Sequence, residues 1–192
     1  MTTAVGARPH IVLADLVPGT WARDAVLIAA GAGLTGLAAQ GSFTLSAISP
    51  VPFTLQTLTV LLVGGALGTV RGLLSIGLYL VAGVAGLPWF AHQSSGWGGP
   101  SFGYIIGFVL AAGVVGELAR RGNDRSVLSA IGVMAIGEAI LLTVGTIWLG
   151  HDLGVSSAKA ISYGVEPFLV WDAVKVVVAA LVLPTAWKLT RR

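Results

Sequence analysis

Two residues of opposite charge, Asp172 and Lys175, lie three positions apart in the otherwise apolar stretch 168–186. In a helix this spacing places both side chains on one face, where a carboxylate acceptor and an ammonium donor can bind each other or a polar ligand. A charge at membrane depth costs at least roughly 2.5 kcal/mol. We therefore predict that the pair binds a ligand. The alternative is an ion pair that only joins helices.

A third ionisable residue, Glu138, lies in the middle of the apolar stretch 127–149 and has no charged neighbour within it. Either burial keeps its carboxyl group neutral, or a cation from another helix approaches it. Lys175 is the only basic residue expected inside the membrane. We therefore predict that Glu138 is neutral or lies near Lys175.

Several chemistries are excluded by residues that are missing or scattered. The chain has no cysteine, and no lysine follows a glycine, so a Walker-type phosphate loop is absent. His10, His92 and His151 lack the spacing of metal ligands, and no metal site is expected. The basic residues lie between apolar stretches, where membrane topology explains them better than nucleic-acid binding does. We predict a protein that is not an enzyme and needs no cofactor.

The composition is that of a membrane protein. Of 192 residues, 55% are hydrophobic and 10% are charged, whereas soluble domains carry about 25% charged residues. We predict an all-α integral membrane protein with a single membrane domain over residues 1–192. Six transmembrane helices are expected within about residues 25–186. Their apolar spans are 25–41, 55–70, 73–87, 103–119, 127–149 and 168–186.

The second and third spans are short, and only Arg71 and Gly72 separate them. A single helix over both spans would overshoot a bilayer, which about 20 helical residues cross. We therefore expect a tight helical hairpin at this point.

The basic residues predict the orientation in the membrane. With a cytoplasmic N-terminus, nine of the 11 Lys and Arg residues fall in cytoplasmic segments, Lys159 falls in an external loop, and Lys175 lies within the membrane. The positive-inside rule then places both termini in the cytoplasm. Residues 1–23 contain Arg8 and Arg23 and do not resemble a cleaved signal peptide. We expect a cytoplasmic or interfacial segment there.

The first span carries two stripes of small residues. Ala25, Ala29 and Gly33 repeat at four-residue spacing, and Ala32 and Gly36 repeat on an adjacent face. Such stripes allow helices to approach closely. The contact is either internal to the bundle or made with a partner membrane protein.

The external loops 42–53 and 88–102 contain no Asp, Glu, Lys or Arg. The second loop is rich in glycine and serine and includes Trp89, Phe90 and Trp97. Glycine gives a backbone the freedom that a moving loop needs. We expect a flexible lid over a pocket, and the alternative is an aromatic anchor at the membrane interface.

Five blocks of sequence, taken together and in order, resemble one family. They are Pro-Val-Pro-Phe-Thr-Leu-Gln-Thr-Leu-Thr-Val-Leu-Leu (50–62), Leu-Gly-Thr-Val-Arg-Gly (67–72), Tyr-Leu-Val-Ala-Gly-Val-Ala-Gly-Leu-Pro-Trp-Phe-Ala (79–91), Gly-Pro-Ser-Phe-Gly-Tyr-Ile-Ile-Gly-Phe (99–108) and Gly-Val-Glu-Pro-Phe-Leu-Val-Trp-Asp-Ala-Val-Lys (164–175). They resemble the BioY family, the biotin-specific substrate-binding (S) components of energy-coupling factor transporters. The resemblance covers about residues 25–185.

This resemblance implies six membrane helices with cytoplasmic termini in the cytoplasmic membrane of a bacterium, and biotin capture from the external side. It implies that Asp172 and Lys175 contact the ligand and that the loop at about 87–103 covers it. It also implies that Ala25 and Ala29, extended by Gly33, dock a transmembrane coupling subunit, which works with two ATP-binding cassette ATPases on separate chains. Trp171 and Glu138 depart from the family pattern.

The chemistry of biotin agrees with this resemblance. Its ureido ring offers one carbonyl acceptor and two N–H donors, which suit Lys175 and Asp172. Aromatic residues are expected to enclose its apolar parts, and amide or hydroxyl groups to add contacts. The further predicted ligand-binding residues are Gln56, Trp89, Phe90, Ser95, Trp97 and Tyr104, and Gln93 and Ser94 remain open beside Ser95. The alternatives are an S component for another small vitamin and a structural membrane protein that transports nothing.

Overall fold

The computed structural model describes residues 11–190, so predictions on Arg8, Arg191 and Arg192 lie outside the described part. Within this range the chain is helical, and its extended pairing is limited to one antiparallel bridge between Phe43 and Phe53. Five helices are long and apolar enough to cross a membrane: α1, α2, α3, α4 and α6. The elements are η1 (Leu13–Leu16), α1 (Trp21–Gln40), α2 (Gln56–Val84), η2 (Ala91–Gln93), α3 (Phe102–Arg120), α4 (Val127–Leu153), α5 (Ser157–Gly164) and α6 (Leu169–Thr190).

Helix α2 combines the second and third predicted spans, and its chain folds back on itself. Gly68 has φ 81° and ψ −179° inside the helix. The Gln56 side chain donates to the Tyr79 hydroxyl at 2.8 Å, whereas a straight helix would separate these residues by about 34 Å. The predicted hairpin is therefore present. It turns at Gly68 instead of at Arg71 and Gly72, because a positive φ is readily adopted only by glycine.

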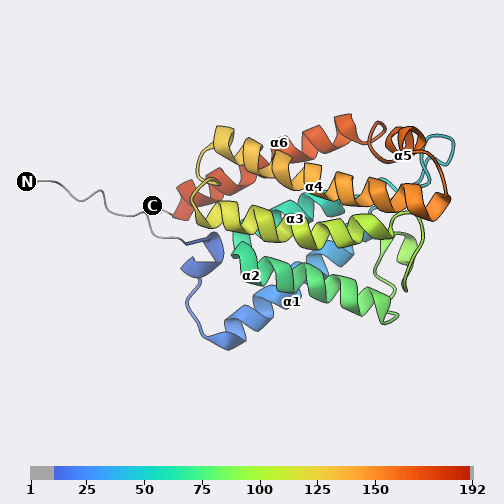
Figure 1. Ribbon diagram of the computed structural model, residues 1–192. Helices are drawn as coiled ribbons and strands as arrows, with labels where there is room; N and C mark the ends of the chain where they lie inside the picture. The colour runs from blue at the N-terminus through green and yellow to red at the C-terminus, as the bar shows by residue number, and fades with distance from the viewer. Residues whose placement is uncertain (1–10, 191–192) are drawn as a thin grey trace, which may run out of the picture.

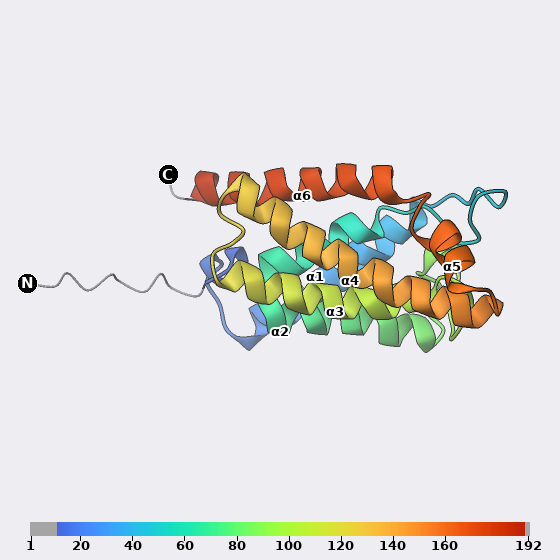
Figure 2. The ribbon, with the colours of Figure 1, turned by 45° about the horizontal axis from the view of Figure 1, so that its top comes forward.

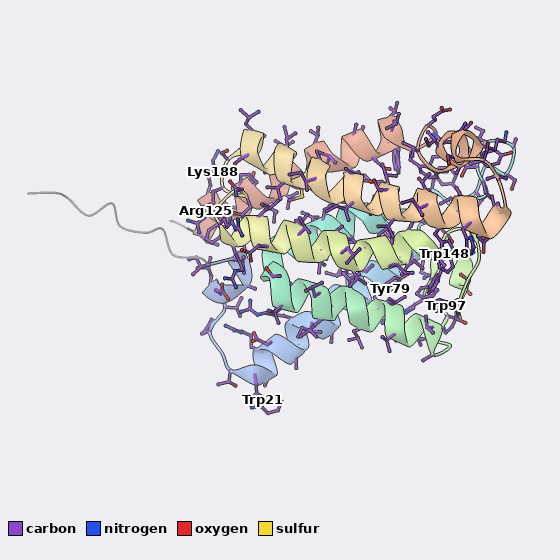
Figure 3. The ribbon with its side chains drawn as sticks, viewed as in Figure 1. Trp21, Tyr79, Trp97, Arg125, Trp148 and Lys188 are labelled. Carbon is purple, nitrogen blue, oxygen red and sulfur yellow. The ribbon has the colours of Figure 1, made fainter. Side chains whose placement is uncertain are left out.

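The bundle has two chemically different ends (Figures 1 and 2). The basic end holds η1, the turn of α2, the α3–α4 connection and the last turns of α6. The loop end holds the segments 41–55 and 85–101 together with α5, a short helix that the sequence analysis did not predict. Figure 3 shows Arg125 and Lys188 at the basic end and Trp97 and Trp148 at the loop end. Both ends of the described chain lie at the basic end.

Close packing between helices depends on glycine. A side chain at Gly64 would meet the backbone of Ala112, and one at Gly116 would meet the backbone at Gly68, so the two halves of α2 lie directly against α3. A side chain at Gly107 would likewise meet the α4 backbone. Small residues permit such contacts where no hydrophobic drive exists between helices. As a result α3 lies at the centre of the bundle, and α1 lies at its edge.

The N-terminal segment is fixed at the basic end. The Asp15 carboxylate accepts from the Val12 backbone N–H at 2.9 Å and pairs with Arg71 at 2.6 Å. Arg71 also reaches Asp24 of α1 at 3.2 Å. The described part of this segment contains the 3₁₀ turn η1, which Asp15 joins to Arg71 of the hairpin.

Candidate ligand-binding site

The described part of the chain encloses a cavity of about 250 Å³ at the loop end, between α2, α3, α4, α6 and both loops. This volume is slightly below the range of about 300–1,000 Å³ that is common for drug-sized ligands. Its apolar wall consists of Val51, Pro52, Phe90, Phe102, Ile105, Phe108, Leu141, Leu142 and Phe168. Its polar wall consists of Thr54, Gln56, Thr57, Ser94, Ser95, Ser101, Tyr104, Asp172 and Lys175.

Asp172 and Lys175 form a buried ion pair at one wall of the cavity. The Lys175 Nζ lies 2.8 Å from the Asp172 Oδ1, and the two side chains are 5% and 4% exposed. Lys175 also donates to the Thr57 hydroxyl of α2 at 2.8 Å. An ammonium group has three N–H donors. Two are used by these contacts, so one remains for a ligand. Helix α6 begins only at Leu169, which places the pair near the loop end.

Glu138 of α4 lies beside this pair. Its side chain is buried, and no N–H or hydroxyl donor reaches either carboxylate oxygen among the described residues, where the Asp172 carboxylate is its side-chain neighbour. Asp172 and Lys175 are its electrostatic neighbours, although no ion pair with Lys175 forms within residues 11–190. The structure thus places Glu138 near Lys175, as one of the two predicted alternatives requires. Two carboxyl groups and one ammonium group share this buried region.

The aromatic wall comes from three segments of the chain: the loop before α3, α3 itself and the residue before α6. Phe168 packs on Phe53 with ring centroids 4.5 Å apart. Tyr104 is buried, and its hydroxyl donates to the Gly164 carbonyl at 2.8 Å, which ties α3 to the segment before α6. Phe90 fills space beside Gly83, where any larger residue would collide with its ring. The predicted residues Phe90 and Tyr104 therefore line the cavity.

Gln56 and Ser95, which the sequence also predicted, line the cavity as well. Of the residues left open in the loop, Ser94 lines the cavity and Gln93 does not. The loop reaches the cavity through unusual backbone angles. His92 and Gln93 have positive φ, as do Gly96, Gly98 and Gly99. Ser94, Ser95, Gly96, Gly98 and Gly99 line the cavity, and Trp97 between them does not.

The structure corrects the placement of Trp89 and Trp97, neither of which lines the cavity. The Trp89 ring packs against Tyr79, and its Nε1 donates to the Tyr79 carbonyl at 2.9 Å. Trp97 is 71% exposed, and its ring lies 4.5 Å from the Phe102 ring at a tilt of 51°. Of the three aromatic residues predicted in this loop, only Phe90 lines the cavity.

Sequence reasoning missed most of the wall. Thr57 is the main omission, because it accepts from Lys175, and its position directly after Gln56 at the start of α2 was the available signal. The remaining missed residues come from both loops and several helices, and only the fold brings them to one cavity. They include Val51, Pro52, Thr54, Ser101, Phe102, Ile105, Phe108, Leu141, Leu142 and Phe168.

The two stripes of α1 face opposite surroundings. Ala32 and Gly36 are buried, and a side chain at Gly36 would meet the Trp89 ring. Ala25 and Ala29 are exposed, and a side chain at Gly33 would meet nothing within 4 Å. The stripe Ala25, Ala29 and Gly33 is therefore an outer face of the described bundle, available to lipid or to another protein.

A helical membrane bundle with an internal, partly charged cavity defines a class of small-molecule-binding membrane proteins. The chain belongs to the BioY family, whose model matches residues 7–192. It is 39% identical over 162 residues to the biotin transporter BioY of Thermotoga maritima, covering 81% of this chain and 92% of that protein. It is 37% identical over 164 residues to the probable biotin transporter BioY of Pyrococcus horikoshii, covering 84% and 94%.

A solved structure shares the fold. The crystal structure of the S-component for biotin from an ECF-type ABC transporter matches with a TM-score of 0.78, at 22% identity, over 88% of this chain and 92% of that one. The family resemblance inferred from sequence blocks is thus confirmed. The relatives are transporters by name, which agrees with the prediction that this chain is not an enzyme.

Proposed function

We propose that this protein is the substrate-binding component of an energy-coupling factor transporter and captures biotin from the external side. The observation that carries this proposal is the buried Asp172–Lys175 pair on the wall of the cavity. The pair offers an acceptor for a ureido N–H and a donor for the ureido carbonyl or the valerate carboxylate. Charge-assisted hydrogen bonds of this kind contribute roughly 1.5–3 kcal/mol each.

Equilibrium binding of labelled biotin to the purified protein tests this proposal, with Asp172→Asn as the variant. The wild type should bind biotin, and the variant should bind it at least tenfold more weakly, because the amide reverses part of the hydrogen-bond pattern. Unlabelled thiamine and riboflavin serve as competitors. Purified protein that carries one of these vitamins and no biotin would favour a different vitamin transporter. No small-molecule binding by either form would favour a purely structural membrane protein.

The basic end is proposed to face the cytoplasm, which places both chain termini inside the cell. Among the described residues, Lys159 is the only Lys or Arg at the loop end apart from the buried Lys175, whereas six lie at the basic end: Arg23, Arg71, Arg120, Arg121, Arg125 and Lys188. The chain has no cysteine, so single-cysteine variants can report topology. Ser46→Cys at the loop end should react with a membrane-impermeant maleimide on intact cells. Arg121→Cys should react only after the cells are opened.

The exposed stripe Ala25, Ala29 and Gly33 is proposed to dock the transmembrane coupling subunit, which would connect this chain to two separate ATPase chains. The support is its outward position and its small side chains, which allow close helix contact. Ala29→Leu should abolish co-purification with a coupling subunit while biotin binding stays unchanged. The matched control is Ala135→Leu, also an exposed alanine in a membrane helix. Equal loss in both variants would contradict docking at this stripe.

A further inference from the structure

A line of three hydrogen bonds lies behind the polar wall of the cavity. The Gln56 Nε2 donates to the Tyr79 hydroxyl at 2.8 Å, and this hydroxyl donates to the Trp89 carbonyl at 3.3 Å. The Trp89 Nε1 in turn donates to the Tyr79 backbone carbonyl at 2.9 Å. Tyr79 is completely buried and does not line the cavity, whereas Gln56 does. Figure 3 shows Tyr79 in the interior near the loop end.

The directions of these bonds follow from the inventory of donors and acceptors. A tyrosine hydroxyl carries one proton, and a backbone carbonyl can only accept. The Tyr79 proton therefore goes to the Trp89 carbonyl, and Tyr79 can only accept from Gln56. A carboxamide has a nitrogen end and an oxygen end of similar shape, and its hydrogen bonds decide which end points where. Tyr79 thus selects the nitrogen end of Gln56.

The oxygen end of Gln56 is left for the cavity. Within residues 11–190, no hydrogen bond reaches the Gln56 Oε1, and this atom is not among the fully buried atoms without a partner. The same wall holds the Asp172 carboxylate, which is another acceptor. Two acceptors on one wall match a ligand with two N–H donors. Lys175 supplies the donor that the intervening carbonyl requires.

We propose that Tyr79 is a positioning residue that fixes Gln56 as a hydrogen-bond acceptor and so makes the site selective for a cyclic urea with both N–H groups free. The proposal rests on biotin as the ligand, as argued above, and adds a residue outside the cavity that determines specificity. Replacing Tyr79 by phenylalanine preserves the ring and removes the hydroxyl. The Gln56 amide then loses its orienting acceptor and can present its nitrogen end to the ligand.

The experiment compares biotin with biotin methylated on a ureido nitrogen, in the wild type, Tyr79→Phe, Gln56→Ala and the double variant. Tyr79→Phe should bind biotin about tenfold more weakly. The dissociation constant of methylated biotin divided by that of biotin should fall by a similar factor. This ratio does not depend on the fraction of protein that is folded. In the Gln56→Ala background, Tyr79→Phe should cause no further loss, because its effect passes through Gln56. Tyr163→Phe, in α5 outside the cavity lining, is the matched control.

Three results would overturn the proposal. They are unchanged biotin affinity in Tyr79→Phe, an unchanged ratio of dissociation constants, and losses that multiply in the double variant as they would for a purely structural role. Failure of the wild type to bind biotin would instead reject the proposed function itself, so the two failures are distinguishable.

Discussion

The two ends of the bundle use charge differently. At the basic end Arg71 pairs with Asp15 and Asp24 at 2.6 and 3.2 Å, and these side chains are between 18% and 37% exposed. On the wall of the cavity at the loop end, Asp172 and Lys175 pair at 2.8 Å and are only 4–5% exposed. The first group joins chain segments where water is near. The second is enclosed by aromatic side chains.

This difference supports the proposal that the first group is structural and the second binds a ligand. Exposed ion pairs typically contribute about 0.2–1 kcal/mol, and the network at the basic end fits that role. A buried pair gains little net stability, because desolvation offsets its attraction, so its presence is weak evidence for a stabilising role. The Asp172–Lys175 pair is better explained by ligand binding.

Lys175→Ala should be the most damaging change at the loop end. It leaves Asp172 buried without its cation, which costs about 3–5 kcal/mol of unfolding free energy, and it removes a ligand donor. Arg121→Ala breaks an exposed pair with Glu117 at the basic end and should cost at most about 1 kcal/mol. Denaturant unfolding in detergent measures both variants. Similar losses for the two would remove the contrast between the ends.

Gly116→Ala should destabilise the basic end by about 1–3 kcal/mol, because the new methyl group would press on the backbone at Gly68. Gly132→Ala provides the opposite case. A methyl group there meets nothing within 4 Å, and alanine favours a helix by roughly 0.5–1 kcal/mol over glycine. Thermal unfolding should therefore shift in opposite directions. Two shifts of the same sign would contradict the close approach of α2 and α3.

Glu138→Gln should stabilise the protein by about 1 kcal/mol, because the amide can donate to the neighbouring Asp172 carboxylate. It should also change biotin affinity, since Asp172 would contact both the new amide and the ligand. Unfolding and biotin binding are measured on the same preparation, with Glu166→Gln, the same change at an exposed carboxylate, as the control. If both quantities match the wild type, Glu138 is not coupled to the pair.

Arg71→Ala should have the smallest effect on the free energy of unfolding, which should fall by at most about 1 kcal/mol. Burial by itself would raise the pKa of Asp15, but the Val12 N–H and the Arg71 guanidinium hold it below its ordinary value. A lowered carboxyl pKa contributes stability above the unfolded pKa, and this contribution is lost as the pH falls through the folded pKa.

Hydrogen exchange of residues 12–17 should therefore show that acid loosens this segment in the wild type. The loosening should be weaker in Arg71→Ala, which has already lost the pair. Identical acid responses in the two proteins would show that Arg71 does not fix the segment.

The sequence was most informative where composition dominates. The apolar spans predicted the helical bundle and its hairpin, and the charges in α6 predicted two residues on the wall of the candidate site. The turn at Gly68 was misplaced by a few residues, because Arg71 is the more visible interruption whereas the backbone angle decides the turn. Trp89 and Trp97 were misplaced because loop turns, which pattern alone does not reveal, decide which rings face inward. Thr57 and the wall of α3 and α4 were missed because only the packing of helices brings them together.

Helix α1 exposes one face on the outside of the bundle, and its last residue contacts the loop that lines the cavity. Its last residue, Gln40, donates to the Trp89 carbonyl at 3.1 Å, and Phe90 follows directly in the cavity wall. When binding at one position changes the affinity at another, the effect is reciprocal. If a partner that binds the outer face of α1 moves this helix, it changes the affinity of the protein for the vitamin by some factor. The vitamin must then change the affinity for the partner by the same factor.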